Sequence, residues 1–218
     1  MFLCIGLTRL TGHEIRFQHL SLNDGLSQNS LFTIIQDRMG LIWLGTQDGL
    51  NLYDGYRFSV FRHDPDRQDS LSDNFILALY EDSRGDLWVG TKGGGVNRLD
   101  RKTHRFTRYQ HQRENQNSLS HNDVRAICED KNGDIWIGTL GGSLNIYNYR
   151  RDQIRRYRYD PEQPGSLSHM QVRVIYRDRS GSLWIGTFGG GLNRYDENLD
   201  QFIHYKHHPD QPGSISSN

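Results

Sequence analysis

The chain has 218 residues, in which 26 lysines and arginines balance 26 aspartates and glutamates. Nucleic-acid-binding proteins usually have an excess of basic residues, and so do polybasic membrane-binding surfaces. Because the net charge of this chain is zero, we expect neither nucleic acid nor a membrane surface as a partner. A hydrophobic fraction of only 34% and 23 glycines favour many turns and several small cores over one large core.

The first 14 residues are apolar but lack the basic region and the full-length apolar core of a signal peptide, so we interpret residues 1–14 as a tail or a signal remnant. Residues 15–20 have the pattern of an outer strand that lacks the other strands of its unit. No segment is long and apolar enough to cross a bilayer, so we expect no membrane insertion by this chain. The two cysteines, Cys4 and Cys128, fit no metal-binding motif and do not fix the compartment.

All four tryptophans occupy one position of a repeated unit. They are spaced by 45, 48 and 48 residues, and each follows an Asp-x-x-Gly turn by the same interval. A repeat of this length predicts stacked or radially arranged supersecondary units. The tryptophans are Trp43, Trp88, Trp136 and Trp184, and the turn aspartates are Asp37, Asp82, Asp130 and Asp178.

Each unit resolves into four short strands joined by turns rich in Asp, Asn and Gly. The first strands are expected at residues 31–36, 76–81, 124–129 and 172–177. Four antiparallel strands per unit are typical of a β-propeller blade, so we predict an all-β propeller with four blades in this chain. The blades are expected at about 25–62, 70–110, 118–159 and 166–206, with residues 207–218 beginning a further blade.

The repeated tryptophans and turn aspartates are predicted to form the structural core. A blade buries both faces against its neighbours, and one large aromatic side chain per blade contributes on the order of 3 kcal/mol. The glycine-rich runs begin strands rather than helices, so they are interpreted as hairpin turns and not as phosphate loops. The carboxylate pairs and scattered histidines form no catalytic or metal-binding set, so we predict no catalytic residue, no metal and no cofactor.

Positions at which the repeats disagree are the better candidates for binding, because the scaffold does not demand them and loops on a rigid scaffold often carry function. A polar rim at the entry to the innermost strands and in the loops between blades is suited to a sugar or an anion. The predicted ligand-binding residues are His63, Asn74, Arg113, His121, Arg125, His169 and Arg173.

The repeated motif Asp-x-x-Gly-x-Ile/Leu-Trp-Ile/Leu/Val-Gly-Thr, with Ser-Leu-Ser at Ser70, Ser118 and Ser166, resembles the two-component regulator propeller repeat. The outer-strand sequence Phe106-Thr107-Arg108-Tyr109 matches it too, and the resemblance covers about residues 15–218. It implies a periplasmic input propeller of a membrane-bound sensor whose output part is a histidine kinase or a diguanylate cyclase. It also implies a small polar ligand such as an oligosaccharide. With four blades and no output domain, the chain is interpreted as an N-terminal fragment of such a protein.

Three functions follow from these features. The first is a non-catalytic, ligand-sensing propeller. The second is an enzyme, because streptogramin lyase-like propellers have a similar repeat. The third is an interaction scaffold, in which the two terminal blade faces associate and complete a ring, unless four blades close alone.

Overall fold

The computed structural model describes residues 19–218, which form four antiparallel sheets of four strands each. The all-β propeller fold is confirmed, and the first strand of every sheet spans the residues predicted for it. The predicted tail at residues 1–14 and most of the strand at 15–20 lie outside the described residues, and His19 and Leu20 are not in a strand. A single turn of 3-10 helix, η1 (Leu22–Asp24), precedes the first sheet.

The first blade consists of β1 (Leu31–Gln36), β2 (Ile42–Thr46), β3 (Gly49–Tyr53) and β4 (Phe58–Phe61). The second consists of β5 (Ile76–Glu81), β6 (Leu87–Thr91), β7 (Val96–Asp100) and β8 (Arg105–Tyr109). The third consists of β9 (Val124–Glu129), β10 (Ile135–Thr139), β11 (Ser143–Asn148) and β12 (Gln153–Tyr157). The fourth consists of β13 (Val172–Arg177), β14 (Leu183–Thr187), β15 (Gly191–Asp196) and β16 (Gln201–Tyr205).

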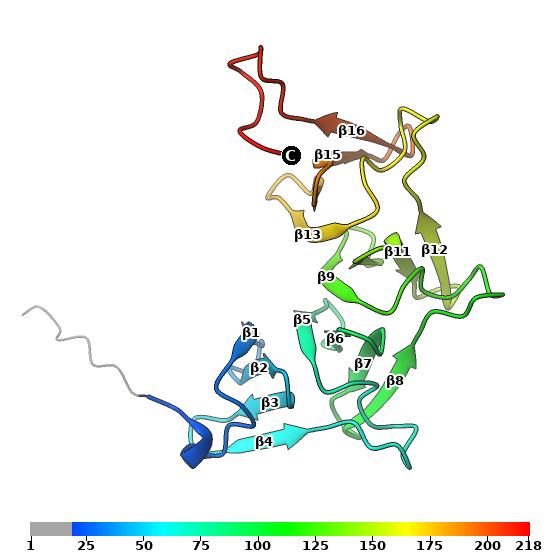
Figure 1. The fold of residues 1–218 in the computed structure, drawn as a ribbon. Helices are drawn as coiled ribbons and strands as arrows, with labels where there is room; N and C mark the ends of the chain where they lie inside the picture. Colours follow the sequence, from blue (N-terminus) through cyan, green and yellow to red (C-terminus); the bar gives the residue numbers. More distant parts are fainter. Residues whose placement is uncertain (1–18) are drawn as a thin grey trace, which may run out of the picture.

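The four blades stand side by side along an open arc (Figure 1). Within each blade the strands follow chain order, and the innermost strands β1, β5, β9 and β13 lie next to one another along the inner edge. The first and last blades of the described chain do not meet, so residues 19–218 do not close into a four-bladed ring.

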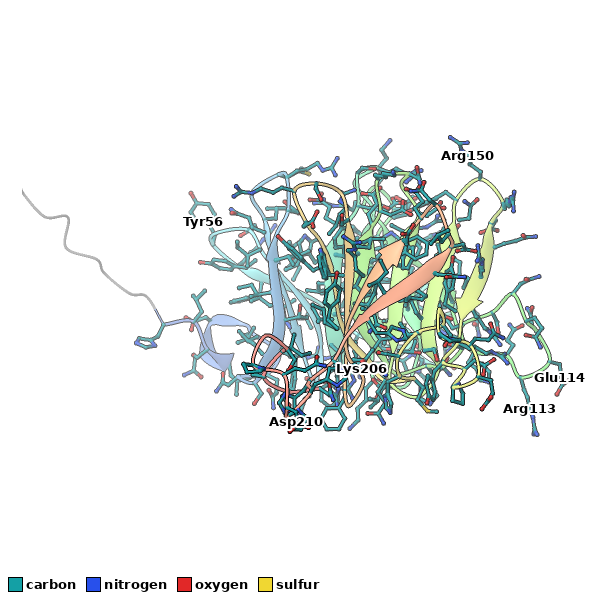
Figure 2. All side chains as sticks on the ribbon, turned by 90° about the horizontal axis from the view of Figure 1, so that it is seen from above. Tyr56, Arg113, Glu114, Arg150, Lys206 and Asp210 are labelled. Carbon is teal, nitrogen blue, oxygen red and sulfur yellow. The ribbon has the colours of Figure 1, made fainter. Side chains whose placement is uncertain are left out.

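Each blade has two edges, one at either end of its strands (Figure 2). The third-to-fourth strand connections, marked by Tyr56 and Arg150, lie at one end, and the linkers between blades, marked by Arg113, Glu114 and Asp210, lie at the other. We call these the turn end and the linker end. The Asp-x-x-Gly turns also lie at the turn end, because they follow the innermost strands, which start at the linker end.

Each turn aspartate holds its own turn and the tryptophan of its blade. Oδ1 of Asp82 accepts hydrogen bonds from the backbone N–H groups of Arg84 at 2.9 Å and Asp86 at 3.0 Å, while Oδ2 accepts the indole N–H of Trp88 at 2.9 Å. Gly85 has a φ of 89°, a left-handed conformation that favours glycine at this turn position. The same indole-to-carboxylate bond measures 2.8 Å for Trp43 with Asp37, 3.0 Å for Trp136 with Asp130 and 2.8 Å for Trp184 with Asp178.

Each buried tryptophan packs against the following blade. Trp88 is fully buried in a cluster with Val124, Ile127 and Ile137 of the third blade. Trp43 and Trp136 are buried in the same way against the second and fourth blades. Trp184 of the last blade is only partly buried, because no blade follows it in the described chain.

The linkers between blades are closed by repeated side-chain contacts. The N–H of His111 donates to Oδ1 of Asn122 at 2.6 Å, and the Nδ1 of His111 lies 2.7 Å from the carbonyl oxygen of Leu119. His207 makes the equivalent contacts with Asn218 at 2.6 Å and with the carbonyl of Ile215 at 2.8 Å. Residues 207–218 therefore have the conformation of the earlier linkers.

Acid is expected to weaken the Asp-x-x-Gly turn of the fourth blade. The hydrogen bonds that Asp178 accepts from Ser180 and from the Trp184 indole lower its pKa from 3.8 to about 2. Because the folded pKa is depressed, the stabilisation is fully present above about pH 4 and is lost as the pH falls toward 2. The melting temperature, followed by circular dichroism, should fall across this window, and the fall should be smaller in Asp178→Asn. An equal fall in both proteins would contradict this assignment.

Candidate ligand site between the third and fourth blades

One side chain after the third strand of a blade reaches back to the Asp–Trp pair of the preceding blade. We call this the covering position, and its occupants are Arg101, Tyr149 and Glu197 in the second, third and fourth blades. The Arg101 guanidinium forms an ion pair with Asp37 and donates to Glu81 at 2.7 Å. Asp37 is only 4% exposed as a result.

Tyr149 covers the next pair in a different way. Its hydroxyl donates to the carboxylate of Asp82, and the indole N–H of Trp88 lies 3.1 Å from the same hydroxyl oxygen. The Arg84 guanidinium lies over the ring of Tyr149, 3.9 Å from its centroid. Asp82 is fully buried. Either a cation, such as Arg101, or a neutral donor, such as Tyr149, therefore shields the Asp–Trp pair from solvent.

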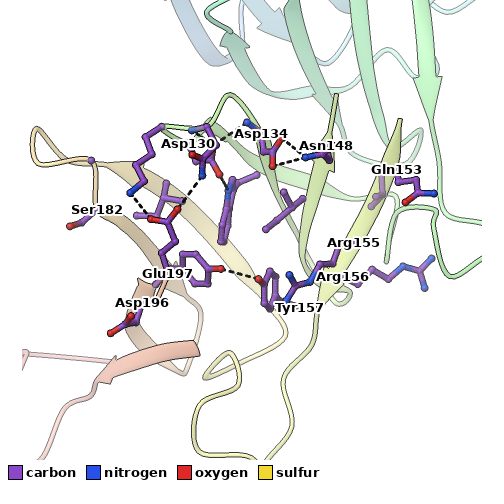
Figure 3. A pocket seen from close by; sticks show the side chains of 18 of the residues that line it. Asp130, Asp134, Asn148, Gln153, Arg155, Arg156, Tyr157, Ser182, Asp196 and Glu197 are labelled. Carbon is purple, nitrogen blue, oxygen red and sulfur yellow. Dashed lines mark hydrogen bonds and ion pairs between the residues drawn. The ribbon is translucent and has the colours of Figure 1, made fainter. Parts of the chain in front are cut away.

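Glu197 cannot seal the third pair, because its carboxylate and that of Asp130 repel each other. It turns instead to Lys131, at 2.5 Å, and to the side-chain amide of Asn132, at 3.2 Å. These hydrogen bonds from Lys131 and Asn132 hold the pKa of Glu197 below its usual value. Asp130 stays partly exposed, and a cavity of about 750 Å³ lies between the third and fourth blades (Figure 3).

The walls of the cavity combine ring faces, cations and carboxylates. On one side β12 contributes Arg155 and Tyr157, and on the other β15 contributes Tyr195. The hydroxyl oxygens of the two tyrosines lie 3.1 Å apart, and the Tyr157 ring stacks on Trp136 with 12° between the planes. The guanidinium of Arg155 lies 4.4 Å from the centroid of the Tyr157 ring.

The carboxylate of Asp134, which lines the cavity, is held by an amide side chain of the same blade. Both oxygens of Asp134 accept hydrogen bonds from the Asn148 amide at 2.9 Å. Burial raises the pKa of Asp134, although the hydrogen bond from Asn148 opposes this shift. Burial and a hydrogen bond with Asp200 raise the pKa of Tyr157, which therefore remains a neutral phenol.

This arrangement suits a ligand that is rich in hydroxyl groups. Arginine and tyrosine supply donors, aspartate supplies acceptors, and flat rings supply apolar contact. No group of three or more His, Cys, Asp or Glu side chains in residues 19–218 is placed to hold a metal ion.

None of the seven residues predicted to bind a ligand lines this cavity. Four lie at the linker end, at the entry to β9 and β13. Arg125 forms a two-point ion pair with Asp123, at 2.5 and 2.8 Å, and Arg173 lies 5.2 Å from the ring centroid of Phe188. His121 and His169 accept backbone N–H groups two residues ahead, at 3.0 and 3.2 Å. These four residues remain a prediction.

The other three, His63, Asn74 and Arg113, belong to the linkers between blades at the same end. The N–H of His63 donates to Oδ1 of Asn74 at 2.7 Å, which is the linker contact also made by His111 and His207. His63 and Asn74 therefore take part in a linker contact that the repeat shares, and their role in ligand binding stays a prediction. Arg113 is almost fully exposed beside Glu114 in a linker between blades (Figure 2), and its role in ligand binding stays a prediction.

The core residues Trp136 and Asp130 do line the cavity. The signal that points to the cavity is the covering position, which changes from Arg101 through Tyr149 to Glu197 at a spacing of 48 residues. A reversal of charge beside a repeated aspartate could have identified this interface from the sequence.

Solved structures share the fold. The chain is similar to the extracellular domain of a hybrid two component system from B. thetaiotaomicron, with a TM-score of 0.77 and 27% identity over 87% of this chain. It is also similar to virginiamycin B lyase from Staphylococcus aureus, with a TM-score of 0.62 and 16% identity over 83% of this chain and 56% of that chain. At 16% identity, the similarity to the lyase establishes only that the two proteins share a fold. No helix among the described residues is long and apolar enough to span a membrane.

Comparisons of the sequence match the repeats of the chain as well. The chain is 42% identical over 65 residues to histidine kinase P4 of Formosa agariphila, which is 30% of this chain and 5% of that protein. It covers 26% of the B. thetaiotaomicron domain, so it spans a small part of both relatives. The model of the two component regulator propeller family matches residues 70–93, 118–141 and 166–189, each containing a Ser-Leu-Ser lead and a tryptophan. Three of the four repeats of this chain therefore belong to the two component regulator propeller family.

Proposed function

We propose that the chain is a non-catalytic part of the extracellular, periplasmic input region of a two-component-type signalling protein. In this proposal it binds a small polar ligand, such as an oligosaccharide, between the third and fourth blades. Support for the location and the sensing role comes from the 27% identical extracellular domain of a hybrid two component system. Support for the ligand comes from the cavity itself.

One observation carries the proposal. Two blade interfaces are sealed by Arg101 and Tyr149, whereas Glu197 leaves the third open onto Asp130, Tyr157 and Tyr195. The rest of the interface keeps the repeated geometry, including the buried Trp136. The opening therefore results from a local change in an otherwise intact scaffold, as expected for a binding site.

Closing the cavity with Glu197→Arg is expected to weaken ligand binding at least about tenfold, equivalent to about 1.4 kcal/mol. The introduced arginine can pair with Asp130 as Arg101 pairs with Asp37, and it then occupies the space that the ligand needs. Isothermal titration calorimetry of the wild-type chain against cellotetraose, xylotetraose, maltotetraose and tetragalacturonate identifies the ligand, and the variant is then titrated with it.

Leu199→Arg is the matched control, because Leu199 is exposed on the same connection and lies outside the cavity. It adds a cation near the site without filling it and should retain the wild-type affinity. Absence of binding to the whole panel, or equal affinity in Glu197→Arg, would contradict the proposal. Turnover of any panel member by the purified chain would contradict its non-catalytic part.

A further inference from the structure

Basic residues are concentrated on the outer strand of the third blade, β12, and on the hairpin that leads into it. Residues 150–158 contain five arginines, whereas the corresponding segments 102–110 and 198–206 contain three basic residues and one basic residue of the Lys and Arg types. The repeated scaffold therefore does not require this charge. A local excess of cations attracts anionic partners, so this segment is a candidate for binding.

One of these arginines belongs to the scaffold. The Arg156 guanidinium donates to the carbonyl oxygens of Ser118 and Asn115, at 2.8 Å each, and thereby holds the linker that precedes its blade. Arg108 makes the equivalent bond in the second blade, to the carbonyl oxygen of Ser70 at 2.9 Å. The repeat thus explains Arg156, and it does not explain the other four arginines.

Arg155 changes the outer strand at the cavity. It stands in the register position that Thr107 and Ile203 occupy in the second and fourth blades. Its guanidinium lies over the Tyr157 ring and pairs with Asp200, yet the side chain remains 60% exposed. On the cavity wall, a cation therefore replaces a small or apolar residue of the repeat (Figure 3).

Arg151 and Arg158 add charge on either side of β12, and both line the same cavity. Both are exposed, and neither forms an ion pair with a carboxylate of residues 19–218. The Arg158 guanidinium lies 3.4 Å from the side-chain oxygen of Gln116, which is a neutral acceptor. Both guanidinium groups therefore have donors free for a ligand.

The carboxylates that line the cavity, in contrast, already have donors. These donors are the Trp136 indole for Asp130, the Asn148 amide for Asp134, the Asn198 N–H for Asp196 and Lys131 for Glu197. The charge that a ligand can neutralise is therefore positive. A ligand with negative groups complements it.

The cavity follows β12 from the turn end to the linker end. Lys131 and Arg151 line it at the turn end, and Gln116 and Arg158 line it at the linker end. The five residues of β12 span about 13 Å, at about 3.3 Å per residue. A ligand that contacts both Arg151 and Arg158 is therefore an extended chain, because a single sugar is shorter than the strand.

We propose that this cavity binds an anionic oligosaccharide, with carboxylate or sulfate groups on its sugars, which lies along β12 with its charges on Arg151, Arg155 and Arg158. The inference rests on the proposed function, because it names the ligand class of the same cavity. Guanidinium groups bind oxyanions through paired hydrogen bonds. The rings of Tyr157 and Tyr195 provide apolar contact for the faces of the sugars.

Isothermal titration calorimetry of the 218-residue chain tests this with tetrasaccharides that differ only in charge. The pairs are tetragalacturonate with its methyl ester, and sulfated maltotetraose with maltotetraose. An anionic member should bind at least about tenfold more tightly than its neutral counterpart, and the pair that shows this difference identifies carboxylate or sulfate as the recognised group. Raising the salt concentration from about 0.05 to about 0.3 M should weaken this binding several-fold, because the arginines are exposed to solvent.

The double variant Arg151→Gln, Arg158→Gln should weaken binding of the anionic tetrasaccharide at least about tenfold and reduce its salt dependence. Both charges are lost while the cavity stays open. The matched control is Arg57→Gln, Arg62→Gln, which removes the same charge on either side of β4 in the first blade, from side chains that are 83% and 49% exposed. It should retain the wild-type affinity. Circular dichroism checks that both proteins keep their sheets.

The outcomes separate this inference from the proposed function. Equal or tighter binding of the neutral tetrasaccharides, or wild-type affinity in the Arg151→Gln, Arg158→Gln protein, would overturn the anionic ligand and leave the sensing role in place. Tighter binding of tetraglutamate than of either anionic tetrasaccharide would assign an acidic peptide instead and would also overturn it. Failure of every saccharide to bind would overturn both.

Discussion

Trp88→Ala is expected to destabilise the chain by about 3–5 kcal/mol, the usual cost of truncating a fully buried aromatic side chain. Trp88 is 0% exposed, fills the interface between the second and third blades, and donates its indole N–H to Asp82. Its loss leaves a cavity and removes one of the two side-chain hydrogen bonds to Oδ2 of Asp82, the other being donated by Tyr149. Because domains are stable by only about 5–15 kcal/mol, the effect should be large in a urea titration.

Trp184→Ala is the matched comparison. Trp184 has the same position in its blade and the same kind of bond to its turn aspartate, at 2.8 Å, but it lacks a following blade and is partly exposed. We expect Trp184→Ala to lower the free energy of unfolding clearly less than Trp88→Ala does. Equal losses for the two variants would show that the tryptophan acts within its own blade and not between blades.

Gly138→Ala is expected to cost about 1–3 kcal/mol through overpacking. A methyl group on Gly138 would lie 2.4 Å from Cγ1 and 3.0 Å from Cβ of Val172 in the fourth blade. Val172 is completely buried and cannot move aside. The two blades would have to move apart, so the melting temperature of the variant should be lower than that of the wild type.

A double-mutant cycle with Val172→Ala isolates this contact. Removing the Val172 methyl groups clears the space that the methyl group added at Gly138 needs, so the double variant should be more stable than the sum of the single effects predicts. Gly186→Ala serves as a control, since its methyl group would meet Val174, which is 52% exposed and free to rotate. Strict additivity of Gly138→Ala and Val172→Ala would contradict the proposed contact.

The repeat made the scaffold predictable. Trp43, Trp88, Trp136 and Trp184 occur at one fixed position, and residues with such a spacing reveal a shared structural task without any tertiary information. The four innermost strands could be delimited because alternating apolar residues end at an Asp-x-x-Gly turn in every copy.

The cavity was harder to predict, because it depends on two residues in different blades. Glu197 is an ordinary surface residue until it is placed beside Asp130, and that placement requires knowing that the covering position reaches back to the preceding blade. His63 illustrates a contact that the sequence alone did not reveal. It is a predicted ligand residue because the linkers differ in sequence, yet His111 and His207 make the same contacts with their own linkers. Whether the arc closes depends on the angle between blades, which no local pattern encodes.

The covering position also bears on how such proteins diversify. Arg101, Tyr149 and Glu197 have equivalent backbone positions, yet two close an interface and one opens it. A single substitution can therefore create or erase a cavity at one interface while the aspartate, the tryptophan and the linker contacts of every blade stay as they were. Duplication of blades multiplies the places at which such a change can be tried, so new binding preferences can arise in one blade pair without endangering the folding of the others.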